Sequence, residues 1–152
     1  MVARIAAARI EVPAPGQETP EAPMPRLRRR SAQVVHARTA AVNRKIARYL
    51  AEHQPATPCL VVDLDVVAAA YRELRQYLPL ARVFYAVKAN PAPEVVTLLN
   101  GLGSSFDVAS RNEIELCLER GVQPECVSFG NTIKKERDIA YAYERGVRLF
   151  AF

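Results

Sequence analysis

The feature that constrains this chain most is a regular alternation of apolar runs with amphipathic segments. From residue 59 onward, short apolar runs suited to β-strands recur, and apolar residues return at helical spacing after each. The predicted strands are residues 59–62, 83–87, 105–109, 127–130 and 147–152. Strands that alternate with helices across short turns are parallel and joined by right-handed crossovers. The alternation therefore predicts an α/β fold.

Capping residues mark several of the predicted helices. Asp63 is suited to cap the helix that follows it, and Ser110 with Glu113 three positions later has the spacing of a capping box. An earlier stretch, residues 33–53, carries apolar residues on one side and stops before Pro55. We therefore expect a helix ahead of the alternating region as well as helices within it.

The repeat length separates two kinds of α/β fold. A strand–helix unit of about 21 residues favours a βα barrel over a doubly wound sheet, and no glycine-rich dinucleotide fingerprint follows a strand. A barrel of this type needs eight strands and about 250 residues, whereas this chain has 152 and ends on an apolar strand. We expect a partial (β/α)8 barrel of the TIM type over residues 57–152, the N-terminal part of a longer protein, preceded by a helix and linker over residues 33–56.

Residues 1–32 differ in composition from the rest of the chain. They hold repeated prolines and a run of arginines, a composition that predicts a disordered leader. The net charge of +5 comes largely from residues 26–48, since acids and bases nearly balance from residue 57 onward. An RNA-binding interpretation of the leader lacks interleaved aromatic residues, so we expect no nucleic-acid partner.

The cysteines and the apolar runs bear on the compartment. Cys59, Cys117 and Cys126 are an odd number without metal-type spacing, and we expect buried free thiols in a reducing cytoplasm. No apolar run approaches the ~20 residues of a membrane span, and the N-terminus lacks the apolar core of a secretory signal. We expect a cytoplasmic protein with no membrane partner and no metal.

Lys88 is the main candidate for chemistry. It directly follows the apolar run 83–87, at the strand end that forms the catalytic face of barrel enzymes. Partial desolvation there would favour the uncharged amine, a nucleophile suited to a carbonyl cofactor or substrate. A surface lysine in a loop is the alternative that these residues leave open. His36 and His53 fall outside the barrel portion, so neither is expected to be catalytic.

Three segments in order resemble those of the alanine-racemase-like, fold-type III pyridoxal-phosphate (PLP) enzymes, which include ornithine, lysine, arginine and diaminopimelate decarboxylases. The segments are Phe-Tyr-Ala-Val-Lys-Ala-Asn-Pro at 84–91, Phe-Asp-Val-Ala-Ser-Arg-Asn-Glu-Ile at 106–114 and Ser-Phe-Gly-Asn-Thr-Ile-Lys-Lys at 128–135. The resemblance implies that Lys88 forms the internal Schiff base with PLP, which acts as the electron sink. It also implies that Asp107 and Glu113 bind the cofactor region, although a helix cap is an alternative role for Glu113.

The remaining polar residues are less specific. Asn131 and Lys134 lie on the loop that follows the next strand. They could contact phosphate or a partner subunit, or they could belong to a solvated loop. We expect Ser110 to cap a helix and Arg111 to face solvent. The loop Gly-Asn-Thr-Ile-Lys at 130–134 is similar to the Ala-Asn-Pro-Cys-Lys of ornithine decarboxylases.

The resemblance implies decarboxylation of L-ornithine to putrescine, in polyamine biosynthesis, by a homodimeric carbon–carbon lyase. Diaminopimelate or lysine decarboxylase and a non-catalytic, antizyme-inhibitor-like homologue are the alternatives. The family's phosphate loop and C-terminal β-domain follow later in the chain than residue 152, so we expect this portion alone to be inactive.

Overall fold

The computed structural model describes residues 8–9 and 32–152, with side chains from residue 40 onward. These residues form two compact units, one containing Val67–Phe152 and the other ending at Val66. Almost all of the predicted leader, residues 1–32, lies outside the described residues. Its described residues are Ala32 and the two-residue strand β1 (Ala8–Arg9), which pairs antiparallel with strand β2 (Arg82–Ala86).

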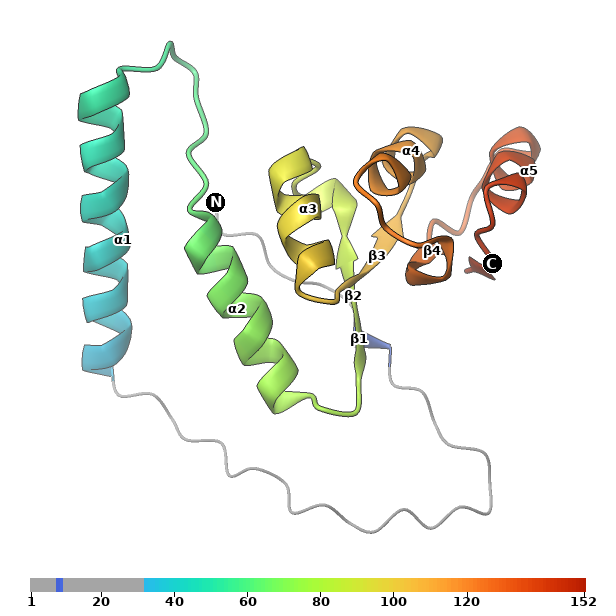
Figure 1. Cartoon of the computed structure of the whole chain (residues 1–152), viewed down its shortest axis with the longest axis horizontal. Helices are drawn as coiled ribbons and strands as arrows, with labels where there is room; N and C mark the ends of the chain where they lie inside the picture. The colour runs from blue at the N-terminus through green and yellow to red at the C-terminus, as the bar shows by residue number, and fades with distance from the viewer. Residues whose placement is uncertain (1–7, 10–31) are drawn as a thin grey trace, which may run out of the picture. The chain divides into compact units, whose positions relative to one another are not determined.

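The larger unit is built on a parallel sheet whose strands follow one another in chain order (Figure 1). The strands are β2 (Arg82–Ala86), β3 (Ser105–Val108), β4 (Val127–Phe129) and β5 (Leu149–Phe150). Each pairs in parallel with the next. A doubly wound sheet reverses its strand order at a switch point, whereas a βα barrel adds every strand at the same edge. The predicted α/β fold of partial-barrel type is therefore confirmed.

Four helices connect or precede these strands, and α3, α4 and α5 follow one another in chain order beside the sheet (Figure 1). They are α2 (Leu64–Tyr77), α3 (Pro93–Gly101), α4 (Arg111–Glu119) and α5 (Glu136–Glu144). Short 3-10 turns, η1 (Val87–Ala89) and η2 (Pro124–Cys126), lie after β2 and before β4. Helices therefore stand between the strands, as the alternation predicted.

A glycine with a positive φ value follows the end of three of these helices. Gly103, Gly121 and Gly146 have φ values of 81°, 76° and 91°, a conformation that costs L side chains energy. After each glycine, the next residue donates its N–H to the carbonyl five positions earlier, at 3.0 Å. These bonds are Ser104 to Leu99, Val122 to Cys117 and Val147 to Ala142. This Schellman pattern satisfies the last helical carbonyls and turns the chain towards the next strand.

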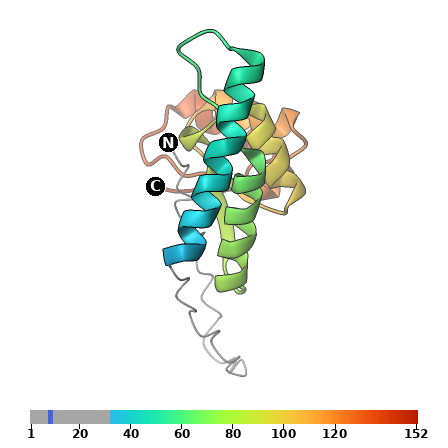
Figure 2. The same ribbon diagram turned by 90° about the vertical axis from the view of Figure 1, so that its left-hand side faces the viewer.

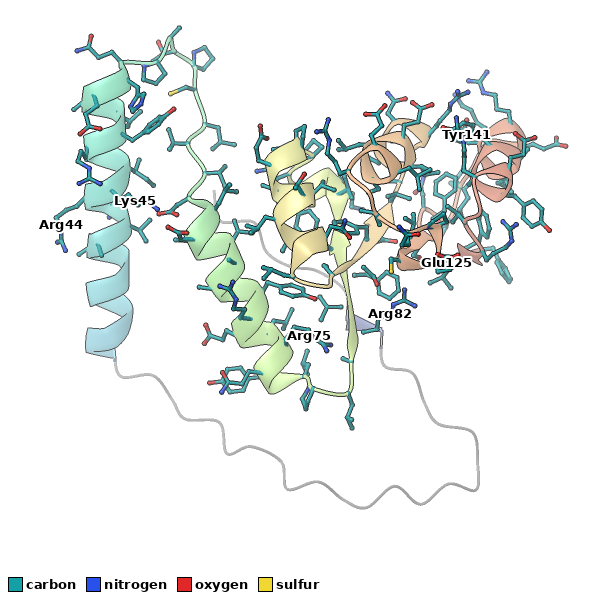
Figure 3. The ribbon with its side chains drawn as sticks, viewed as in Figure 1. Arg44, Lys45, Arg75, Arg82, Glu125 and Tyr141 are labelled. Atoms are coloured by element: carbon teal, nitrogen blue, oxygen red, sulfur yellow. The ribbon has the colours of Figure 1, made fainter. Side chains whose placement is uncertain are left out.

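The core lies between the sheet and the helices. Its largest fully buried side chains include Tyr85, Phe106, Phe129, Leu99 and Ile114. Arg82 connects the amino ends of the strands. Its Nε donates to Ser105 Oγ at 2.8 Å, and its guanidinium donates to the Glu125 carbonyl at 2.6 Å (Figure 3). These bonds connect β2 to β3 and to the turn before β4.

The smaller unit contains α1 (Ala32–His53), one unbroken helix of 22 residues (Figure 2), which agrees with the helix predicted at 33–53. Lys45 on α1 forms ion pairs with Asp63 at 2.9 Å and Asp65 at 2.7 Å. Asp63 also accepts the Asp65 N–H at 3.0 Å, so the predicted cap before α2 is confirmed. None of the helices in the described ranges combines the length and apolar character that crossing a bilayer requires.

The strand predicted at 59–62 is wrong, because these residues are irregular and lie in the smaller unit. An apolar run becomes a strand only when a neighbouring strand accepts its backbone hydrogen bonds, and no strand of the described chain pairs with it. Leu60 is 69% exposed, and Cys59 is exposed rather than buried as predicted. Cys126 is half-buried and only Cys117 is fully buried.

The three thiols should therefore react differently. Burial raises the pKa of the Cys117 thiol to about 12, so almost no thiolate exists at neutral pH. We expect iodoacetamide to modify Cys59 in the native protein and to spare Cys117, with all three cysteines modified in urea. Peptide mass spectrometry measures this, and native labelling of Cys117 at the rate of Cys59 would contradict the burial described here.

Candidate active site

Lys88 lies on a turn at the carboxyl end of β2. The strand ends at Ala86, and residues Val87–Ala89 form the 3-10 turn η1, closed by a 3.1 Å bond from the Asn90 N–H to the Val87 carbonyl. Val87 is fully buried, but the Lys88 side chain is exposed. The predicted partial desolvation of Lys88 is therefore not found within this chain, because the turn carries the side chain past the end of the strand.

Asp107 reaches the same edge from the next strand. In the register of the sheet Asp107 pairs with Ala86, two residues before Lys88, and on its other side with Ser128. Burial raises the pKa of this carboxyl group, and attraction by the Lys88 ammonium partly offsets the rise. The structure thus brings together two residues that stand 19 positions apart in the sequence, because parallel strands present their carboxyl ends at one edge.

The Asp107 carboxyl group has a pKa above its ordinary value, and burial is the main cause. Attraction by Lys88, hydrogen bonds from Ser128 and the Gly130 N–H, and attraction by Lys134 all act against this rise and only partly offset it. The carboxylate is therefore partly desolvated yet surrounded by donors and cations. A carboxyl group whose pKa is shifted by burial beside a specific charge is typical of functional sites.

Gly130 provides the space that this conformation of Asp107 needs. A Cβ atom at position 130 would lie 1.9 Å from Asp107 Oδ1 and 2.7 Å from its Cγ. Any larger residue there would force the carboxylate to rotate away from the Gly130 N–H. Sequence reasoning missed this role, because a glycine after a predicted strand is equally typical of an ordinary turn.

Glu113 is engaged at the start of α4. Its carboxylate accepts the Ala109 N–H at 2.8 Å, and its own N–H donates to Ser110 Oγ at 3.3 Å. The predicted cap by Ser110 is confirmed, with the carboxylate reaching one residue further back than in the usual capping box. The structure thus shows the capping role of Glu113, and its cofactor-binding role stays a prediction.

The loop after β4 is braced by its own polar residues. The Asn131 side chain donates to the Ile133 carbonyl at 2.8 Å, and Lys134 donates to the Ala151 carbonyl while lying 5.2 Å from the centre of the Phe129 ring. Lys134 is the further cation whose charge acts on Asp107, a contribution that the sequence did not indicate. Arg111 faces solvent as expected and pairs with Glu115 at 3.0 Å.

Neither histidine is expected from the sequence to be catalytic. His53 stacks on Tyr49 with ring centres 4.2 Å apart, in the smaller unit. The side chain of His36 lies outside the described residues.

These donors fit a cofactor with an aldehyde group. Lys88 offers an accessible primary amine, and Asp107 carries a carboxylate whose ionisation responds to that amine. An accessible lysine amine can attach a carbonyl compound covalently as a Schiff base.

A family profile described as pyridoxal-dependent decarboxylase, pyridoxal binding domain, matches residues 64–152, more than half of the chain. The chain belongs to this family. Pyridoxal phosphate is accordingly its cofactor.

Curated relatives of the chain are amino-acid decarboxylases and a related protein. A lysine/ornithine decarboxylase from Selenomonas ruminantium is 45% identical over 73% of this chain, and a chloroplastic ornithine decarboxylase from Nicotiana glutinosa is 42% identical over 62%. Antizyme inhibitor 2 from Xenopus laevis is 40% identical over 60%. The chain spans only 28%, 22% and 20% of the lengths of these three relatives.

A solved structure agrees with this assignment. The crystal structure of the Selenomonas ruminantium enzyme in complex with PLP and cadaverine matches with a TM-score of 0.65 and 45% identity. The match covers 71% of this chain and 28% of that one.

Replacing Asp107 by Asn separates stability from function. Because the folded-state pKa of Asp107 lies above 3.8, the folded protein binds more protons than the unfolded one between these two pKa values. The free energy of unfolding therefore falls as pH rises through this window, and Asn removes that loss. We expect Asp107→Asn to be at least as stable as the parent at neutral pH but to attach PLP more weakly.

Urea unfolding at several pH values, together with PLP titration, measures both effects. Glu119→Gln, which removes an exposed carboxylate at the end of α4, is the matched control. A variant that loses stability at neutral pH and keeps its PLP affinity would contradict the role given to Asp107.

Proposed function

We propose that the protein decarboxylates a basic amino acid, with L-ornithine as its substrate and putrescine as its product, and that Lys88 holds the PLP cofactor. The observation that carries this proposal is the Lys88–Asp107 pair at the carboxyl edge of a parallel sheet, within a pyridoxal-binding domain. The proposal concerns the whole protein, because the chain spans less than a third of the length of the relatives reported above.

Each residue of the site has a distinct task. The Lys88 amine attaches the cofactor, which when bound supplies the electron sink that decarboxylation needs. Asp107 attracts the Lys88 ammonium and, because its pKa is raised, is suited to exchange a proton with Lys88 Nζ. The Gly130 N–H and Ser128 orient that carboxylate. Glu113 supports the cofactor region by holding the turn at Ala109.

Ornithine is favoured among the basic amino acids by two observations. The loop at 130–134 is similar to that of ornithine decarboxylases, and two of the relatives above are named for ornithine. Lysine is the alternative substrate, since the Selenomonas ruminantium enzyme is named for both. The likeness to antizyme inhibitor 2 supports a non-catalytic homologue as the second candidate. We further propose a cytoplasmic homodimer, as the resemblance to the family implies.

Attachment of PLP can be tested on the chain directly. Lys88 competes with the other lysines of the chain, which are Lys45, Lys134 and Lys135. We expect borohydride reduction after incubation with PLP to leave the pyridoxyl group on Lys88, and Lys88→Ala to abolish specific attachment. Peptide mass spectrometry identifies the site. Lys45→Ala, which changes an ion-paired lysine of α1, should behave as the parent does.

The substrate is tested by turnover of the full-length protein. Release of carbon dioxide and the product amine are measured with ornithine, lysine, arginine and diaminopimelate. We expect the highest kcat/KM with ornithine, putrescine as product, and loss of nearly all turnover in Lys88→Ala. A higher kcat/KM with lysine would overturn the substrate assignment. PLP bound at Lys88 without turnover of any of the four would favour the non-catalytic candidate.

A further inference from the structure

We propose that Tyr85 is a positioning residue for Lys88, acting through a hydrogen bond that fastens the turn on which the lysine lies; this inference rests on the proposed function. Tyr85 is 1% exposed and stands on β2, three residues before Lys88. Its hydroxyl donates to the Asn90 carbonyl at 3.1 Å, two residues after Lys88. The bond therefore spans the segment that carries the lysine.

Asn90 is the fixed point of this segment. Its N–H donates to the Val87 carbonyl at 3.1 Å, its side-chain oxygen accepts the Ala92 N–H at 3.1 Å, and its carbonyl accepts the Tyr85 hydroxyl. The residues between Val87 and Asn90 are Lys88 and Ala89, both exposed. Because packing does not hold an exposed side chain, the direction of Lys88 depends on how firmly its backbone turn is held.

The ring of Tyr85 also connects this turn to the strand that carries Asp107. Tyr85 and Phe106 are partners in the β2–β3 register, and their rings meet edge to face with centres 6.3 Å apart at an angle of 83°. Phe106 directly precedes Asp107. The buried ring therefore packs beside one member of the site while its hydroxyl holds the turn of the other.

The hydroxyl group is what distinguishes tyrosine from phenylalanine at this position. A phenylalanine ring would fill the same space and keep the contact with Phe106, but it would leave the Asn90 carbonyl without this donor. Burial raises the pKa of Tyr85, so the hydroxyl stays protonated and remains a donor at neutral pH. The proposal thus predicts a local effect of Tyr85→Phe on the lysine turn.

The test compares Tyr85→Phe with Tyr71→Phe in the full chain. Tyr71 is also buried, at 3% exposure, but it lies on α2 and its hydroxyl bonds to Ser104. Amide hydrogen exchange of the peptide covering residues 84–91 is measured without cofactor. We expect the Asn90 amide to exchange about fivefold faster in Tyr85→Phe and at the parental rate in Tyr71→Phe.

The second measurement is PLP attachment at Lys88, monitored by titrating the protein with PLP and trapping the product with borohydride. We expect the PLP concentration for half-attachment to rise about fivefold in Tyr85→Phe and to be unchanged in Tyr71→Phe. Parental values of both quantities in Tyr85→Phe would overturn the proposal. So would faster exchange with unchanged PLP attachment, or equal effects of the two substitutions.

Failure of the proposed function gives a different result. If the parent chain attaches no PLP at Lys88, the proposed function fails, while hydrogen exchange still decides whether Tyr85 fastens the turn. Faster exchange confined to Tyr85→Phe would then support the bond as the holder of Lys88, and parental exchange would overturn it.

Discussion

The in-register pairing of β2, β3 and β4 is the constraint on which the site depends. Ala86, Asp107 and Ser128 stand in one row across the three strands. Because the strands are parallel, the segments that follow them leave the sheet at the same edge. Lys88, Gly130 and Lys134 belong to those segments, and all three act on Asp107. A shift of one residue in β3 would send Asp107 to the opposite face of the sheet.

The site carries an electrostatic cost that the rest of the unit must offset. Burial of Asp107 disfavours its charged form, and the nearby cations and donors only partly compensate. Arg82, at the other end of the strands, is exposed to no such cost in the bonds it makes, since two of its nitrogens donate to Ser105 and to the Glu125 carbonyl. The two ends of the sheet therefore differ in their electrostatics. At one end the side chain of Arg82 is hydrogen-bonded, and at the other a carboxyl group with a raised pKa lies on the strand next to an exposed lysine. Perturbed carboxyl groups of this kind are typical of functional sites.

Membership of the pyridoxal-dependent decarboxylase family gives this edge its chemical meaning. The family supplies the cofactor. The described edge presents an amine on a hydrogen-bonded turn, a half-buried carboxylate on the next strand and a glycine that leaves room for that carboxylate. For Glu113 the resemblance to the family and the observed geometry point to different roles. The resemblance implied a cofactor-binding role for Glu113, whereas the structure shows its carboxylate bonded to the Ala109 N–H. A cap of this kind shapes the site through the backbone.

The sequence alone predicted the order of the elements and the parallel sheet, and it singled out Lys88 as the candidate residue. It could do so because periodicity, helix caps and the three motifs are local in the chain. Its local signals failed at residues 59–62, where an apolar run lacks a strand partner and stays exposed. Only the tertiary structure decided the contact of Gly130 with Asp107, the bond from Tyr85 to Asn90 and the exposure of Lys88. These features depend on register, on a buried hydroxyl's direction and on where a turn ends. Such distances between side chains arise from packing, and no spacing in a single sequence encodes them.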